Sequence, residues 1–148
     1  MIQLRKALAT DIPEMLRLVM ELAIYEKAPE QVTNTEARML EEGFGENPAF
    51  GCILAEEDTK IVGLAIYYYR YSTWKGKRIY LEDLIVTESQ RGKGTGKLLF
   101  DTVIEIGKET NCSGMMWQVL DWNEPAINFY KNYPTRFDEG WLNAHLDF

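Results

Sequence analysis

The chain has 148 residues, the length of one ordinary domain; 46% of them are hydrophobic and 26% are charged. This composition excludes a disordered or low-complexity chain. The formal net charge of −7 makes nucleic acid a poor partner and favours a cationic ligand.

The placement of apolar and metal-binding residues argues against two further classes of protein. The central run without a charge, residues 61–69, is far shorter than the about 20 residues of a membrane-spanning helix. Arg5, Lys6 and Asp11 interrupt the segment where a signal peptide needs its apolar run, so we expect a cytoplasmic protein without membrane contact. Because the two cysteines and the single histidine are far apart in sequence, we expect no metal site.

Hydrophobic periodicity and capping residues predict the elements in the first half of the chain. We expect residues 2–8 to form a strand, followed by a helix that Thr10 caps and a short helix that Thr35 opens. Strands rich in residues that favour pleated structure are expected at residues 50–55 and 61–70.

In the second half, a strand at residues 79–86 leads into the glycine-rich segment of residues 90–96, and an amphipathic helix follows. The last three expected elements are a strand at residues 115–120, a helix capped by Asn123 and a strand at residues 141–148. The order β-α-α-β-β-β-α-β-α-β predicts one α/β domain over residues 1–148, built on a sheet of mixed direction.

The segment Arg91-Gly92-Lys93-Gly94-Thr95-Gly96 carries the sharpest chemical signal. Its glycines permit positive φ angles and close approach of a ligand, and the N-terminus of the following helix attracts anions. Arg91, Lys93 and Lys97 add positive charge for phosphate oxygens. The segment lacks the Gly-Lys-Ser/Thr of a P-loop and the glycine spacing of a dinucleotide-binding motif. It therefore predicts a site for a ligand that carries a pyrophosphate.

The Arg-x-x-Gly-x-Gly spacing of this segment resembles the coenzyme A loop of the GNAT acetyltransferases. Two flanking regions resemble the branch of spermidine/spermine and thialysine acetyltransferases: Tyr80-Leu81-Glu82-Asp83 before the loop, and Trp122-Asn123-Glu124-Pro125 with Ile127-Asn128-Phe129-Tyr130-Lys131 after it. The resemblance implies the GNAT fold, a mixed central β-sheet with splayed parallel strands and helices on both faces.

The resemblance also implies acetyl-CoA as the co-substrate and indicates where it binds. The pantetheine arm would pair with the backbone of the strand that holds Leu84, Ile85 and Val86, and the pyrophosphate would take main-chain amides of the glycine loop. Asn123 to Ala126 would meet the coenzyme near its sulfur. The complete expected set of coenzyme contacts is Leu84, Ile85, Val86, Arg91, Gly92, Lys93, Gly94, Thr95, Gly96, Lys97, Asn123, Glu124, Pro125 and Ala126.

Direct transfer of the acetyl group to a primary amine is the implied reaction. Glu82 matches the family's general base, acting through a water, and Tyr130 matches its general acid. Alternation along a strand places Tyr80, Glu82 and Leu84 on one face, so Glu82 and Asp83 are not expected to point to the same space unless a bulge re-aims one. Asp83 is the alternative base. Expected acceptor contacts are Tyr25, Glu26, Glu82, Met116, Trp117, Gln118 and Glu139.

Together these features predict an N-acetyltransferase for a small polyamine or diamine. The alternatives are a thialysine-like or lysine-like amine, or a peptide amine, as the acceptor. A non-catalytic module that binds acetyl-CoA is a hypothesis of a different class. The resemblance further implies a homodimer.

Overall fold

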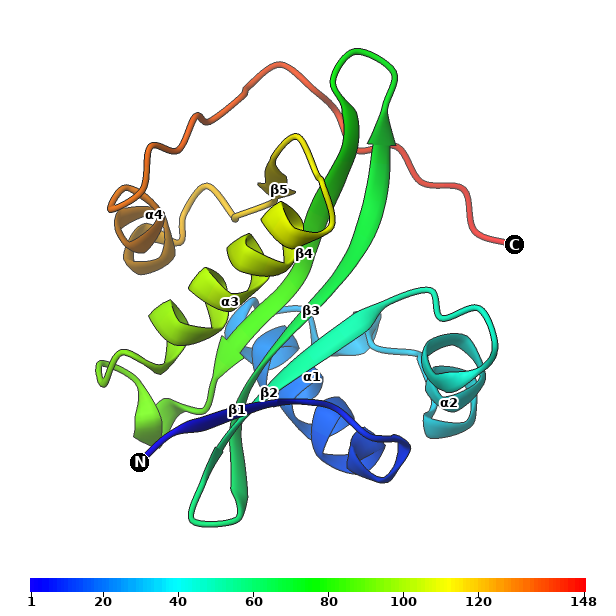
Figure 1. The fold of residues 1–148 in the computed structure, drawn as a ribbon, viewed down its shortest axis with the longest axis vertical. Coiled ribbons are helices and arrows are strands. Elements are labelled where there is room, and N and C mark those ends of the chain that lie inside the picture. Colours follow the sequence, from blue (N-terminus) through cyan, green and yellow to red (C-terminus); the bar gives the residue numbers. More distant parts are fainter. The chain divides into compact units, whose positions relative to one another are not determined.

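A five-stranded β-sheet forms the centre of the computed structural model, which describes all 148 residues (Figure 1). The strands lie in the spatial order β1 (Gln3–Lys6), β2 (Gly51–Glu57), β3 (Lys60–Ser72), β4 (Gly76–Val86) and β5 (Met115–Trp117). The first four are antiparallel neighbours, whereas β4 and β5 run parallel. The expected sheet of mixed direction is thereby confirmed.

The chain divides into two compact units, residues 1–118 and residues 119–148. The first holds the sheet and the helices α1 (Ile12–Tyr25), α2 (Glu36–Phe44) and α3 (Thr95–Glu109). The second holds α4 (Glu124–Tyr130) and a segment without regular structure. The single domain expected over residues 1–148 stays a prediction.

Helices cover both faces of the sheet in the first unit. On one face, Met15 and Leu18 of α1 and Met39 of α2 form a buried cluster with strand residues that include Leu64. On the other face, α3 buries Leu99, Phe100 and Val103. Burying each such side chain contributes about 1.5–3 kcal/mol, so these two apolar layers hold the helices against the sheet.

Capping residues in the sequence predict where most of the helices begin. The hydroxyl of Thr35 accepts a hydrogen bond from the backbone N–H of Arg38 at 3.1 Å, which confirms the expected cap of α2. Thr10, in contrast, is not the cap of α1. It lies inside the short 3-10 helix η1 (Ala9–Asp11), because the carboxylate of Asp11 accepts from the Leu8 N–H at 2.7 Å and pairs with Arg5 at 2.8 Å. Helix α1 therefore begins after Asp11.

The expected strand at residues 141–148 is wrong. This segment has no strand partner, and the sheet ends at β5. Its large apolar side chains are exposed, among them Trp141 at 80% and Leu142 at 94%. A strand is stabilised by the ladder of hydrogen bonds and side-chain pairs that a neighbour supplies, and an apolar pattern alone does not provide one. For the same reason β5 covers only Met115–Trp117 of the strand expected at residues 115–120.

No helix of the structure is both long enough and apolar enough to span a membrane.

Candidate active site

The parallel pair β4–β5 opens after three residues. Ile79, Tyr80 and Leu81 of β4 pair with Met115, Met116 and Trp117 of β5, and no pairing with β5 continues beyond Leu81. From Leu84 to Val86, β4 pairs only with β3 on its other side. This half of β4 therefore presents an open edge, where an extended ligand can replace the missing strand. It agrees with the splayed parallel strands that the family resemblance implied.

A β-bulge lies at the same point of β4. Asp83 pairs with Ile66 of β3 and Leu81 pairs with Tyr67, so Glu82 is an extra residue without a partner on β3. The bulge shifts the alternation of side chains by one residue. Asp83 and Ile85 therefore face α1, and Ile85 joins the buried cluster on that side. The prediction allowed for a bulge that re-aims one of the two carboxylates, and this bulge is present, so Glu82 is not opposite Asp83.

The bulge directs two neighbouring carboxylates into one pocket, which we call the acidic pocket. Its volume is about 410 Å³. Helix α1, the segment that follows it and β4 line this pocket with Val19, Leu22, Ala23, Glu26, Ala28, Gln31, Val32, Thr33, Asn34, Glu82 and Asp83. The lining therefore contains three carboxylates and no lysine, arginine or histidine. No group of three or more His, Cys, Asp or Glu side chains in the chain is arranged to hold a metal ion.

Two carboxyls of the acidic pocket, those of Asp83 and Glu26, have raised pKa values. Burial raises the pKa of Asp83 to about 7, and the negative charges of Glu82 and Glu26 add to the rise. Burial also raises the pKa of Glu26. A carboxyl with a pKa near neutrality can gain and lose a proton at physiological pH, which is the property of a general acid or base.

Tyr68 on β3 is a site residue that the sequence analysis missed. Its hydroxyl donates a hydrogen bond to Glu82 at 3.2 Å, and its ring stacks on Tyr80 with centroids 5.1 Å apart. Burial raises the pKa of Tyr68 to about 12, with the charge of Glu82 as a further cause, so the hydroxyl keeps its proton and remains a donor. The tandem tyrosines were visible in the sequence, but only the β3–β4 register places Tyr68 beside Glu82.

The glycine loop has the backbone that an anion site needs. Gly92 and Gly94 have φ angles of 77° and 86°, in the region that favours glycine. Gly94 is the N-cap of α3 and offers no side-chain cap to the first amides of the helix. The Thr95 hydroxyl next to it is buried and has no hydrogen-bond partner. Unsatisfied donors at a helix N-terminus fit the oxygens of a phosphate group.

The three cations around this loop already contact neighbouring groups in the structure. Lys93 Nζ donates to the side chain of Gln90 at 2.8 Å, and Lys97 forms an ion pair with Asp101 one turn along α3. Arg91 Nε donates to the carbonyl of Val86 at 2.9 Å. The two lysines are exposed, and an exposed ion pair contributes only about 0–1 kcal/mol, so exchanging these partners for a phosphate costs little.

Four other expected acceptor contacts of the first unit lie outside the lining of the acidic pocket: Tyr25, Met116, Trp117 and Gln118. The Tyr25 ring lies 5.1 Å from the Arg91 guanidinium, and the Trp117 ring makes an edge contact with Phe100 of α3 at 5.1 Å. Met116 Sδ accepts from Arg70 Nη1 at 2.9 Å. Of the expected acceptor residues in the first unit, the structure thus brings Glu26 and Glu82 together and adds Asp83 to them.

The second unit supplies the remaining expected site residues. The Asn123 side chain caps α4 by accepting from the Ala126 N–H at 3.3 Å, as predicted, and Pro125 occupies the first turn. Tyr130 is the last residue of α4; its ring packs edge-on against Phe129, and its carbonyl accepts from the Thr135 hydroxyl at 2.7 Å. Glu139 lies in the segment without regular structure.

An open strand edge, a glycine loop at a helix N-terminus and a pocket lined by carboxylates together suit transfer of a group from a pyrophosphate-bearing donor to a cationic acceptor. The model of the acetyltransferase (GNAT) family matches residues 13–133. Thialysine N-epsilon-acetyltransferase of Mus musculus is 38% identical over 98% of this chain and 92% of its own length. Spermidine/spermine N(1)-acetyltransferase-like protein 1 of Homo sapiens is 38% identical over 94% of this chain and 21% of its own length.

Among solved structures, an aminoglycoside acetyltransferase from an uncultured soil metagenomic sample superposes with a TM-score of 0.80. It is 16% identical and covers 99% of this chain and 96% of its own, so the likeness is one of fold. The chain belongs to the acetyltransferase (GNAT) family. It is an N-acetyltransferase, and enzymes of this family use acetyl-CoA as the co-substrate.

Proposed function

We propose that this enzyme transfers the acetyl group of acetyl-CoA to a primary amine of a small polyamine or diamine. The observation that carries the proposal is the acidic pocket, whose lining has three carboxylates and no cationic side chain. An extended amine with several positive charges gains from each carboxylate in turn. Of the two relatives named above, one is named for acetylation of thialysine and the other for its likeness to spermidine/spermine acetyltransferases, and these acceptors are small amines too.

A thialysine-like amino acid is the second candidate, and the similarity to thialysine acetyltransferases favours it. Such an acceptor carries an α-carboxylate besides its reactive amine. In the acidic pocket this group would face Glu26, Glu82 and Asp83 without a cation to pair with, although Gln31, Thr33 and Asn34 offer neutral polar contacts. Like charges in one partly buried site repel, so the lining favours an acceptor without a carboxylate.

The acceptor amine must lose a proton before it attacks. An alkylamine has a pKa of about 10.4, so almost all of it is a cation at neutral pH. In the proposal, Glu82 accepts this proton through a water while the hydroxyl of Tyr68 holds its carboxylate in place. Asp83 is the alternative base, favoured by its place in the same pocket and its pKa of about 7. The neutral amine then attacks the thioester carbonyl directly.

The first unit would hold the donor by two features of its backbone. The open edge of Leu84 to Val86 would pair with the amides of the pantetheine arm, and the amides from Gly92 to Lys97 would bind the pyrophosphate. The Thr95 hydroxyl, which lacks a partner inside the protein, fits such an anion. Arg91, Lys93 and Lys97 would balance its charge.

The second unit carries the residues that the proposal assigns to the sulfur end of acetyl-CoA. In the proposal Asn123, Glu124, Pro125 and Ala126 meet that end of acetyl-CoA, and Tyr130 donates a proton or a hydrogen bond to the departing thiolate. A tyrosine of ordinary pKa, about 10, is a weaker acid than a thiol of about 8.5, so hydrogen bonding precedes full proton transfer. Glu139 would hold a distal nitrogen of the polyamine.

A cytoplasmic homodimer is part of the same proposal, and light scattering on the purified protein tests the dimer.

A thiol-release assay with acetyl-CoA tests the acceptor. Spermidine, putrescine, thialysine and a peptide with a free N-terminus are compared by kcat/KM. The proposal expects the largest value for spermidine or putrescine. A larger value for thialysine would establish the second candidate, and turnover of the peptide alone would refute both. Calorimetric binding of acetyl-CoA without turnover of any amine would instead show a non-catalytic binding module.

A further inference from the structure

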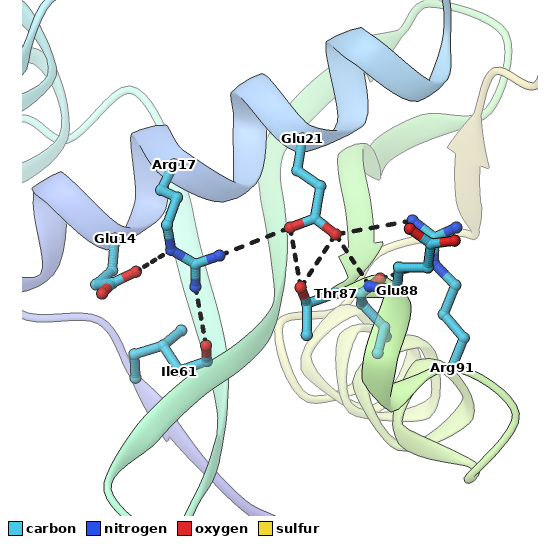
Figure 2. A network of polar contacts seen from close by, with 8 residues as sticks. Glu14, Arg17, Glu21, Ile61, Thr87, Glu88 and Arg91 are labelled. Atoms are coloured by element: carbon cyan, nitrogen blue, oxygen red, sulfur yellow. Dashed lines mark hydrogen bonds and ion pairs between the residues drawn. The ribbon is translucent and has the colours of Figure 1, made fainter.

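A network of polar contacts centred on Glu21 joins helix α1 to the start of the glycine loop (Figure 2). Both carboxylate oxygens of Glu21 lie 3.0 Å from the hydroxyl of Thr87, and one of them accepts from the backbone N–H of Glu88 at 3.0 Å. Glu88 is the first residue of the short 3-10 helix η3 (Glu88–Gln90). Glu21 therefore binds the segment through which β4 enters the loop.

Two arginines flank this carboxylate. Arg91 Nη2 lies 4.0 Å from Glu21, and the guanidinium also covers the ring of Tyr25, one turn further along α1. On the other side Arg17 lies 3.6 Å from Glu21 and donates to the carbonyl of Ile61 at 3.0 Å. Because both arginines offset its charge, Glu21 can sit close to a site for an anion.

The part of the loop beyond this network has little support of its own. Gly92 and Gly94 adopt positive φ angles in open space, and no side chain caps the N-terminus of α3. A glycine-rich backbone loses much conformational entropy when a ligand orders it. Contacts that fix the loop before the ligand arrives remove part of this cost and so increase affinity.

We propose that Glu21 is a positioning residue for the donor. By holding Thr87, Glu88 and Arg91, it arranges the amides of Gly92 to Lys97 before the pyrophosphate binds. The inference rests on the proposed donor site at this loop. It deepens that proposal, because helix α1 then lines the acidic pocket with Leu22, and with Glu26 at its C-cap, and holds the donor loop with Glu21.

Two acetyl donors distinguish an effect of Glu21 on pyrophosphate binding from an effect on the rest of the enzyme. Acetyl-CoA carries the pyrophosphate, whereas S-acetylpantetheine offers the same thioester and pantetheine arm without it. Loss of the Glu21 contacts in Glu21→Ala is expected to lower kcat/KM for acetyl-CoA about tenfold, mainly through KM, with kcat changed less than about twofold. The value for S-acetylpantetheine stays within about twofold of the wild type. Glu21→Gln keeps an oxygen acceptor and should be intermediate.

Glu14→Gln is the matched control. Glu14 lies on the same helix and pairs with the same Arg17, but it makes no contact with the loop, so its kinetics with both donors should remain those of the wild type. Thr87→Val removes one of the Glu21 contacts without changing charge and should reproduce a smaller part of the acetyl-CoA effect.

Three results would overturn the inference. Equal losses with both donors would assign Glu21 to the general fold or to the acceptor side. An unchanged KM for acetyl-CoA in Glu21→Ala, Glu21→Gln and Thr87→Val would show that the loop does not depend on the Glu21 contacts. Tighter calorimetric binding of coenzyme A by Glu21→Gln would show that charge repulsion, not positioning, dominates. Failure of the proposed function is distinct, since it would appear as inactivity of the wild-type enzyme with every amine.

Discussion

The raised pKa of the partly buried Asp83 carboxyl predicts how the free energy of unfolding depends on pH. Its pKa is about 7 in the folded protein against 3.8 for an ordinary aspartate, because burial and the charges of Glu82 and Glu26 disfavour ionisation. Between these two pH values the unfolded chain has lost the proton that the folded chain still holds. The free energy of unfolding therefore falls as the pH rises from about 4 to about 7, and stays at its lower value above that.

The size of this change in the free energy of unfolding follows from the size of the pKa shift of Asp83. At about 1.4 kcal/mol per pKa unit, ionising Asp83 in the folded state costs about 4 kcal/mol. Asparagine has nearly the same shape and cannot ionise. We expect the free energy of unfolding of the wild type to fall by about 3 kcal/mol more than that of Asp83→Asn between about pH 4.5 and pH 8.5, because about 2.5 units of the shift lie within this range. This difference corresponds to about 10 °C in Tm.

Urea unfolding of both proteins at the two pH values measures this difference directly. Titrating groups that do not interact with Asp83 contribute equally to both proteins and cancel in the comparison, as does any pH-independent cost of burying the asparagine amide. Glu82 and Glu26 interact with Asp83, so their coupling to it is part of the measured difference. Asp147→Asn, which changes an exposed aspartate near the C-terminus, is the matched control and should follow the wild type. Parallel pH profiles of the wild type and Asp83→Asn would refute the reasoning, because they would mean that Asp83 ionises as freely in the folded as in the unfolded chain.

Four further predictions concern the site. Tyr130→Phe should lower kcat about 100-fold while calorimetry finds the Kd for acetyl-CoA within about twofold of the wild type; undiminished turnover would remove Tyr130 from the reaction. Glu82→Gln should flatten the alkaline rise of kcat/KM, and an unchanged pH profile would assign the base to another group. Glu26→Gln should raise the KM for spermidine about tenfold, unlike the exposed control Glu30→Gln, and equal KM values would place the polyamine elsewhere. Thr95→Val should raise the free energy of unfolding by up to about 1 kcal/mol, because the hydroxyl it removes has no partner, yet weaken acetyl-CoA binding in calorimetry; a destabilised variant, or one that binds equally well, contradicts this.

Most elements that position the site were predictable because their signals are local. Thr35 and Asn123 cap α2 and α4 through hydrogen bonds to an N–H three residues further on, so the relevant spacing is visible in the sequence. Gly92 and Gly94 predict a backbone conformation that other residues rarely adopt, and both have positive φ angles in the structure. The strand that ends at Val86 and the helix after the loop followed from hydrophobic periodicity in the same way.

The chemistry of the groups present can also be predicted from the amino-acid sequence: the glycine loop, the acidic residues and the tyrosine that ends α4. Which of these groups lie close together depends on the three-dimensional fold. The bulge at Glu82 turns Asp83 into the same pocket, the β3–β4 register brings Tyr68 to Glu82, and Glu21 reaches a loop that lies far along the chain. Residues 141–148 have a strand-like pattern of apolar residues, but they form no strand because no neighbouring strand pairs with them. Register, bulges and long-range hydrogen bonds depend on the partner that the fold supplies, and a single segment of sequence does not contain that partner.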